Sequence, residues 1–338
     1  MKQYQELLRK TKTEIKVVKP SGAYATVVQH STTSDGNDVL TVNVKYPLII
    51  HAEFLRHRQL SRGVKSNRAI PTKKIRQEVL DDPYVPQWFG QNKSGMVSQQ
   101  EVKMPRVARF LWKSARYPAC GMHWLLEKVG LHKELCNRIL NPFQWVRETI
   151  TATEWDNLYN LRIHKDAQRD IKDIIGAIYE AHQQSTPVKL ESGQWHVPYV
   201  DRGMSNHGAM LYFDTDGNRL TVEQAIKCAT ARCARSSYDN HDKSSATRGK
   251  DISLYESLVI SDPAHASPVE HSCTPIQPMA SFGIGNDKNH DSIPLTWEGG
   301  VTHVDREFNL WSGNFKGWIQ HRQTLSSHVC SKYVPHED

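Results

Sequence analysis

The feature that most constrains the fold of this chain is the apolar run from Val39 to Ile50, which leads directly into a segment dense in positive charge. The run is rich in β-branched residues, which predicts a strand that Pro47 should end. The segment that follows, from Glu53 to Arg68, carries four arginines, one histidine and two serines. Like charges beside a buried element must be solvated or paired, so we interpret this segment as a binding site for a multiply charged anion.

Shorter elements surround this run. Strands are predicted for residues 16–18 and 24–28, followed by a turn over 33–38. The spacing of apolar residues predicts a short helix over 50–60, and a basic helix should begin at Thr72.

The rest of the chain is predicted to form a helical body and a second α/β unit. A helical pattern runs through residues 105–180, and a capping box at Thr221 should start a later helix. A stretch rich in Gly, Asp, Asn and His, 283–304, is expected to be a surface loop. A polar stretch that contains proline and glycine is the expected linker. The predicted division of the chain is residues 1–187, linker 188–208 and residues 209–338.

Composition limits the classes of function. The chain has 338 residues, a net charge of +7 and a sequence pI near 9.0, which favours anionic partners such as nucleotides or phosphorylated cofactors. Lys and Arg are spread along the sequence, so a dedicated nucleic-acid-binding protein is the less favoured alternative. Six cysteines without a CxxC pair, and the lack of a signal sequence or apolar span, predict a soluble cytoplasmic protein with reduced thiols. The histidines show no helical His-x-x-x-His pair with a nearby carboxylate, so metal catalysis is not predicted.

One internal similarity links the two ends of the chain. The segment Leu55–Ser61 resembles Ile319–Ser326, and an aromatic residue, Phe54 or Trp318, precedes each. We therefore weigh two explanations, chance and a C-terminal α/β unit that is a diverged copy of the N-terminal one.

Four segments together resemble the motifs of one enzyme family. They are Arg56-His57-Arg58-x-x-Ser61-x-x-x-x-Ser66-x-Arg68; Asn157-Leu158-Tyr159-Asn160-Leu161-Arg162 with Ala167-Gln168-Arg169-Asp170-Ile171; Ala234-Arg235-Ser236-Ser237-Tyr238; and His265-Ala266-Ser267-Pro268-Val269-Glu270-His271. These segments resemble motifs of the flavin-dependent thymidylate synthases, whose signature runs Arg-His-Arg-x-x-Ser-x-Asn-Glu-x-Ser-x-Arg. The resemblance covers about residues 38–187 and 225–324.

The order of the segments departs from that of an ordinary member. In the family the Ser-Tyr and His-x-Ser-Pro-x-Glu-His segments precede the Arg-His-Arg signature, whereas here they follow it. In this respect the chain is similar to longer, virus-encoded proteins described as thymidylate synthase-like, which implies location in a host cytoplasm.

The resemblance implies a fold and a reaction. The fold is α+β, of the flavin-dependent thymidylate synthase type, with a mixed sheet and a helical body. The reaction is the reductive transfer of a one-carbon unit from methylenetetrahydrofolate to C5 of a deoxypyrimidine monophosphate, dUMP, with FAD as hydride carrier and NADPH as reductant. Family members build their sites from several subunits, which implies a homo-oligomer: a tetramer or, for a duplicated chain, a dimer.

The resemblance also implies roles for individual residues. Arg56 and Arg58 are the predicted catalytic residues, because their charge would stabilise negative charge on the flavin ring or the pyrimidine carbonyls. The predicted flavin-binding residues are His57, Asn157, Ser237, His265, Ser267 and Glu270. The predicted nucleotide-binding residues are Glu53, Ser66, Arg68, Arg138 and Arg162, whose guanidinium groups would grip the phosphate.

One departure from the signature leaves the reaction product open. The family's Asn-Glu pair is Gly63-Val64 here, which removes a carboxylate from the nucleotide pocket. An alternative is therefore a related flavin and folate enzyme that makes a hydroxymethylated or otherwise modified deoxypyrimidine monophosphate from dUMP or dCMP. The alternative of another class is a basic nucleic-acid-binding protein without catalytic activity.

Overall fold

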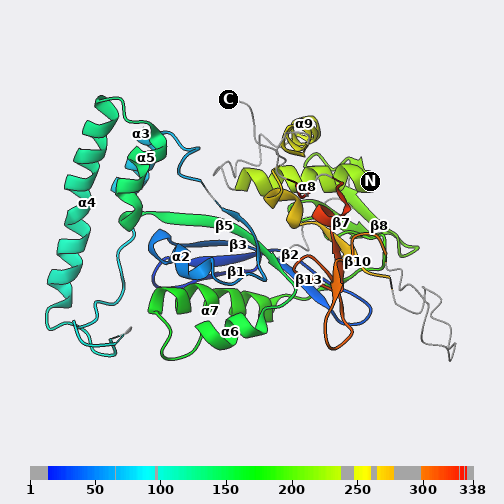
Figure 1. The fold of residues 1–338 in the computed structure, drawn as a ribbon, viewed down its shortest axis with the longest axis horizontal. Coiled ribbons are helices and arrows are strands. Elements are labelled where there is room, and N and C mark those ends of the chain that lie inside the picture. Colours follow the sequence, from blue (N-terminus) through cyan, green and yellow to red (C-terminus); the bar gives the residue numbers. More distant parts are fainter. Residues whose placement is uncertain are drawn as a thin grey trace.

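A computed structural model describes residues 14–64, 66–95, 98–236, 247–259, 265–277, 298–326, 328–330 and 332. It combines helices with several antiparallel sheets, so the chain has an α+β fold. Figure 1 shows a central sheet with a helical arm to one side and the C-terminal strands and helices on the other. Within the described ranges, no helix combines the length and the apolar character needed to cross a lipid bilayer.

The central sheet has six described strands. Five pair antiparallel in the order β1 (Lys16–Val18), β2 (Tyr24–Thr32), β3 (Asp38–Pro47), β5 (Trp145–Ala152) and β4 (Ser61–Val64), and β6 (Val188–Lys189) pairs in parallel with β2. β3 ends at Pro47, as the sequence predicted. Between β3 and β4 lie η1 (Leu48–Ile50) and α2 (His51–Phe54), so the predicted helix over 50–60 ends earlier than expected.

The two faces of this sheet differ in character because successive side chains of a strand point to opposite sides. The apolar face carries Leu40, Val42, Val44, Val146, Ile150 and Ala152. It is covered by α6 (Asp156–Arg162) and α7 (Arg169–Gln184), whose buried residues include Ile171, Ile174, Ile175 and Ile178. The polar face carries the residues between them, among which are Thr41, Asn43, Thr149 and Thr151.

A bulge in β2 decides which of its side chains meet each face. The pairing of β2 with β3 shifts between Val27 and Gln29. Beyond the shift, Gln29 lies opposite Thr41 on the polar face, and His30 lies opposite Leu40 on the apolar face. Without the extra residue these side chains would point to the other sides of the sheet.

The helical arm connects β4 to β5. It contains α3 (Thr72–Asp81), α4 (Pro105–Lys128), α5 (Lys133–Cys136) and η2 (Asn137–Phe143). α3 begins at Thr72, as predicted, but the helical pattern expected over 105–180 is wrong at β5. β5 is a central strand and is buried on both faces, so its short run of residues cannot be told from a helix by period alone.

Three small sheets and four helices make up the C-terminal part of the described chain. The sheets are β7 (Asp201–Met204) with β8 (Met210–Phe213) and β9 (Arg219–Leu220); β10 (Cys273–Pro275) with β14 (Trp318–Gln320); and β11 (His303–Val304) with β12 (Leu310–Ser312) and β13 (Phe315–Lys316). The helices are α8 (Val222–Ser236), α9 (Arg248–Val259), η4 (Ser267–Glu270) and η6 (His321–Thr324).

Local signals in this part of the chain explain its first helix. Gln224 N donates to Thr221 Oγ1 at 3.2 Å, and Thr221 N donates to Gln224 Oε1 at 3.1 Å, which is the predicted capping box. The stretch 188–208, expected as a linker, carries β6 and β7. Of the loop expected over 283–304, residues up to 297 lie outside the described ones.

Candidate functional site

The candidate site lies where C-terminal segments cover the polar face of the sheet. We call this contact the polar seam and define it by Ser31, Thr41, Ser61, Thr151, His196, Glu270, His271 and Gln320. All of these residues except Glu270 are buried. Buried polar groups must be paired to offset the loss of water, so the geometry of the seam is set by its hydrogen bonds.

A row of hydrogen bonds enters the seam from β7. Arg202 Nη1 donates to Ser31 Oγ at 2.7 Å, and the same oxygen lies 2.7 Å from His196 Nδ1. His196 Nε2 in turn lies 2.8 Å from Thr41 Oγ1. The imidazole of His196 therefore joins β2 to β3 from the C-terminal side of the contact.

The row continues through β5 to the His-x-Ser-Pro-x-Glu-His motif. Thr41 Oγ1 lies 2.7 Å from Thr151 Oγ1, which lies 2.9 Å from His271 Nδ1. Burial lowers the pKa of His271 to about 4 and lowers that of His196 well below its usual value, so both rings are neutral at neutral pH. His271 Nε2 is buried without a hydrogen-bond partner beside Gly63, where a Cβ would lie only 3.3 Å from that nitrogen.

Gln320 joins the front and rear motifs of the chain. Its Nε2 donates to Ser61 Oγ at 3.1 Å and to the carbonyl oxygen of Glu270 at 3.0 Å. Two residues later, Arg322 donates to Glu270 Oε1 at 2.5 Å. Burial raises the pKa of Glu270, and the hydrogen bond from Arg322 opposes that shift. The Ser of the first signature thus lies beside the Glu of the last motif.

The front of the signature contacts α6 instead. Arg162 Nε donates to His57 Nε2 at 2.8 Å. Because Nε2 accepts this bond, the hydrogen of the neutral ring is on Nδ1. Burial, followed by the charges of Arg162 and Arg62, lowers the pKa of His57 and keeps the ring neutral.

Arg62 serves the fold rather than an exposed ligand. Its Nη2 donates to the carbonyl oxygen of Phe54 at 2.5 Å, and its Nη1 lies 3.6 Å from Glu148 Oε1. Tyr46 donates to the other oxygen of Glu148 at 2.5 Å. Burial raises the pKa of Glu148, and the charge of Arg62 is the largest influence that lowers it. These contacts fix the segment that carries the signature against the apolar face.

The remaining predicted site residues lie at the surface or outside the described chain. Those with exposed side chains are Glu53, Arg56, Arg58, Arg68, Arg138, Asn157, His265 and Ser267. Ser66 is half-buried, Arg138 belongs to the helical arm, and Ser237 lies outside the described residues. The structure therefore brings His57 to Arg162 and Glu270 to the neighbourhood of Ser61, while Arg56, Arg58 and Arg68 have exposed side chains.

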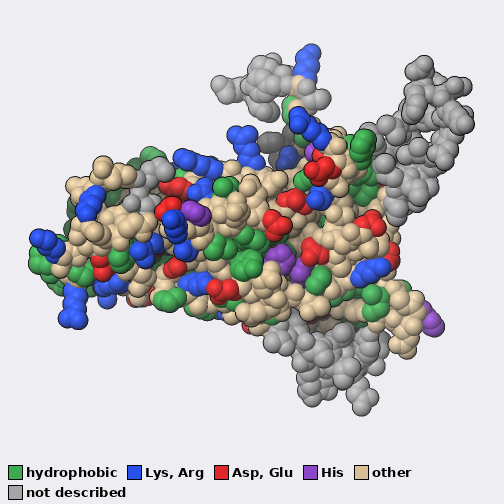
Figure 2. Space-filling model, turned by 90° about the horizontal axis from the view of Figure 1, so that it is seen from below, with side chains coloured by type: hydrophobic (Ala, Val, Ile, Leu, Met, Phe, Trp, Pro, Cys, Tyr) green, Lys and Arg blue, Asp and Glu red, His purple; other side chains and the backbone are tan. Residues whose placement is uncertain are grey.

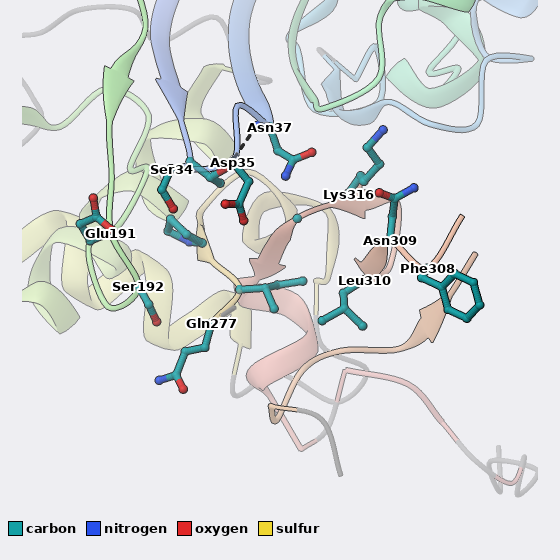
Figure 3. A pocket seen from close by; sticks show the side chains of 14 residues that line it. Ser34, Asp35, Asn37, Glu191, Ser192, Gln277, Phe308, Asn309, Leu310 and Lys316 are labelled. Atoms are coloured by element: carbon teal, nitrogen blue, oxygen red, sulfur yellow. Dashed lines mark hydrogen bonds between the residues drawn. The ribbon is translucent and has the colours of Figure 1, made fainter. Parts of the chain in front are cut away.

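A separate cavity of about 360 Å³ opens between the β2–β3 turn and the C-terminal strands (Figure 3). Its labelled wall includes Ser34, Asp35, Asn37, Glu191, Gln277 and Lys316. Acidic and basic side chains are mixed in this wall, and Lys316 Nζ lies 3.2 Å from Glu154 Oε1. None of the predicted site residues lines the cavity.

Comparison with known proteins finds a distant similarity to an enzyme. The chain is 28% identical over 149 residues to the flavin-dependent thymidylate synthase of Aquifex aeolicus (strain VF5). The match covers 42% of this chain and 45% of the relative, so the chain matches less than half of that protein's length. No family model matches the chain.

Sequence reasoning missed the residues that complete the polar seam. His196 and Tyr199 lie in the stretch expected as a linker; Tyr199 Oη lies 2.7 Å from Thr149 Oγ1. The signal that could have indicated a covered face is the alternation in β3, where Thr41 and Asn43 interrupt an apolar run. Polar residues at alternate positions are usually taken as solvent-facing, but these are buried.

Proposed function

We propose that this chain is a flavin-dependent enzyme of the thymidylate synthase type that transfers a one-carbon unit from methylenetetrahydrofolate to C5 of dUMP. The observation that carries the proposal is the bridge made by the Gln320 amide between Ser61 and Glu270, two motif residues 209 positions apart. The distant similarity to a flavin-dependent thymidylate synthase supports it independently.

Residues in the seam and outside it support binding of an anionic flavin dinucleotide. In the seam, His271 Nε2 is a buried nitrogen without a hydrogen-bond partner; outside it, the exposed Arg56 and Arg58 follow α2. FAD, when bound, supplies the hydride that converts the transferred methylene group to a methyl group. Arg56 and Arg58 stabilise negative charge on the flavin ring or the base, and the flavin is held by His57, Asn157, Ser237, His265, Ser267 and Glu270.

His57 and Arg162 have a shared part in this proposal. The hydrogen bond from Arg162 Nε leaves the His57 Nδ1–H as a donor and holds the ring in one orientation. The remaining guanidinium nitrogens of Arg162 can bind the nucleotide together with Glu53, Ser66, Arg68 and Arg138. Arg138 belongs to the helical arm, so its contribution is easiest to place in a homo-oligomer in which an arm reaches a neighbouring copy.

The first test is spectroscopic. Purified protein is expected to show the visible absorption of oxidised flavin, and NADPH should bleach it. Incubation with methylenetetrahydrofolate and either dUMP or dCMP should then give thymidylate from dUMP. A chain that neither retains nor rebinds FAD would overturn the proposal.

Nucleotide binding gives the second test. Arg68→Ala should weaken dUMP binding by about 2–5 kcal/mol if the guanidinium pairs with the phosphate in a closed site. Arg106→Ala, which removes an exposed arginine from α4, is the matched control and should leave the affinity unchanged. Equal affinity of Arg68→Ala and wild type would remove Arg68 from the site.

A second product remains a specific alternative because of Val64. The register of β4 and β5 places Val64 opposite Glu148, whose carboxylate is already held by Tyr46 and faces Arg62. Position 64 then offers no carboxylate to the nucleotide. The alternative outcome of the product analysis is therefore a product made from dCMP, or a hydroxymethylated product. A nucleic-acid-binding role is not favoured. On the face of the molecule drawn in Figure 2, Lys and Arg side chains are interspersed with acidic ones and form no continuous basic stripe.

A further inference from the structure

Three side chains that can bind a metal ion meet on the apolar face of the sheet. His30 comes from β2, Asp38 from the first position of β3 and His182 from the last turn of α7. One ligand atom from each lies within 4.8 Å of the other two. The bulge in β2 makes this meeting possible, because it turns His30 toward α7 instead of toward the polar seam.

Each histidine is oriented by a second contact. His30 Nδ1 lies 3.1 Å from the hydroxyl oxygen of Ser185, and His182 Nδ1 lies 3.0 Å from that of Tyr159. In both rings Nε2 is the nitrogen left for another partner. Metal-binding histidines commonly engage one ring nitrogen in such a contact while the other binds the ion.

The nitrogen of His30 that faces the cluster has no hydrogen bond. The His30 side chain is only 4% exposed, and its Nε2 lies 3.5 Å from Asp38 Oδ2. That distance is long for a hydrogen bond, but two ligands of a tetrahedral Zn²⁺ ion lie about 3.4 Å apart. A buried nitrogen left in this way calls for a partner.

The exposure of the cluster also suits an ion. The Asp38 side chain is 40% exposed, so an ion can enter from solvent and keep a water ligand. The ligand atoms lie at most 4.8 Å apart. Bringing the widest pair to the spacing of about 3.4 Å between ligands of a tetrahedral ion requires a shift of at most about 1.4 Å.

We propose that His30, Asp38 and His182 bind a divalent transition-metal ion of the Zn²⁺ class, with a fourth position open to water. Two imidazoles and one carboxylate favour such an ion over Mg²⁺ or Ca²⁺, which prefer oxygen ligands. The ion fastens the end of α7 to the β2–β3 hairpin. This site does not depend on the reaction proposed above.

The test uses Co²⁺ as a visible probe in the full chain after treatment with EDTA. One equivalent of Co²⁺ should give the absorption of a low-symmetry, four-coordinate site, Zn²⁺ should displace it, and Mg²⁺ should not. Asp38→Asn should weaken the Co²⁺ affinity at least tenfold. Ser185→Ala and Tyr159→Phe, which remove the contacts that orient the rings, should weaken it less. Zn²⁺ should also raise the Tm of the wild-type protein.

The matched control is the pair His164 and Asp166, whose Nδ1 and Oδ2 also lie 3.5 Å apart but on the surface. His164→Gln and Asp166→Asn should leave Co²⁺ binding unchanged. The proposal is overturned if the wild type takes up no stoichiometric Co²⁺, or if the control variants lose it as Asp38→Asn does. Absence of a Zn²⁺-dependent rise in Tm overturns it as well, and that readout requires no variant to fold.

Discussion

The two faces of the central sheet belong to the same strands, but different interactions attach the segments that cover them. On the apolar face, α7 contacts β2 and β3 and places Ile174 and Ile178 in one apolar cluster with their side chains, so the contact depends on volume and area. On the polar face, Thr41 and Thr151 meet His271 through hydrogen bonds, and the contact depends on direction and on complete pairing. The first kind tolerates a change of shape, whereas the second tolerates almost no change of chemistry.

The two faces also differ in the groups that they bring together. Packing contacts can be exchanged among aliphatic residues with little loss. A face that instead buries hydroxyls and imidazoles carries groups that recognise ligands, and here it brings Ser61 close to Glu270 and His271. The covered polar face is therefore where Ser61 of the first motif meets the last motif, whereas His57 and Arg162 meet beside α6.

The largest effect is expected from the apolar face. Ile178→Ala should lower the free energy of unfolding by about 4 kcal/mol, because it leaves a cavity under α7, and Ile178→Val should cost about 1 kcal/mol. Urea denaturation measures both. A loss below 1 kcal/mol for Ile178→Ala would show that α7 contributes little to this face.

The second prediction concerns pH and the seam. The pKa of His271 is about 4 in the folded chain and 6.5 in the unfolded one, so below 6.5 the unfolded state binds more protons. Stability should be complete above pH 6.5 and decline as the pH falls toward 4, with His271 accounting for about 3 kcal/mol of the loss. Urea midpoints between pH 4 and 7 test this. His271→Gln should flatten the dependence, whereas His164→Gln, at the surface, should not; equal slopes in all three proteins would contradict the assignment.

Removal of one hydroxyl gives the third prediction. Thr151→Val keeps the shape but breaks the link between Thr41 and His271, so it should cost about 2 kcal/mol. Hydrogen exchange should accelerate in residues 271–275 more than in α7. Thr151→Ser retains the hydroxyl and is the control. Equal protection in Thr151→Val and Thr151→Ser would mean that packing, not hydrogen bonding, holds the polar face.

The smallest effect is expected at Gly63. A methyl group there would lie 3.3 Å from His271 Nε2, and His271 cannot retreat without stretching its bond to Thr151. Gly63→Ala should cost about 1 kcal/mol after the gain from a less flexible unfolded chain. Gly299→Ala, at an exposed turn with open space around it and no positive φ, isolates the contribution of the unfolded chain. A Gly63→Ala protein more stable than wild type would show that the seam has room to spare.

Much of the local structure could be predicted from the sequence, but little of the seam. Pro47 and the capping box at Thr221 act on residues within a few positions, so the end of β3 and the start of α8 follow from local rules. The sequence predicts helix where β5 lies, because burial on both faces hides the period of this strand.

Contacts across the seam have no local signature. Thr41 and His196 are 155 positions apart in the sequence, and Thr151 and His271 are 120 apart. Neither segment contains a local pattern that indicates its partner. The family resemblance predicted which motifs form the site. It gave no indication of Gln320 as the residue that bridges two of them, nor of the His30 cluster, because three separate elements assemble it.

The row of hydrogen bonds across the polar face begins at a group that can only donate, the guanidinium of Arg202. Ser31 therefore accepts from Arg202. If the Ser31 hydroxyl gives its own hydrogen to His196 Nδ1, the His196 ring carries its hydrogen on Nε2 and donates to Thr41.

The same direction passes on through the sheet. In that arrangement Thr41 donates to Thr151, and Thr151 donates to His271 Nδ1, which leaves the hydrogen of the His271 ring on Nε2. A permanent cation at one end of the row then favours one tautomer of an imidazole three strands away. In that tautomer the buried Nε2 of His271, beside Gly63, is a donor.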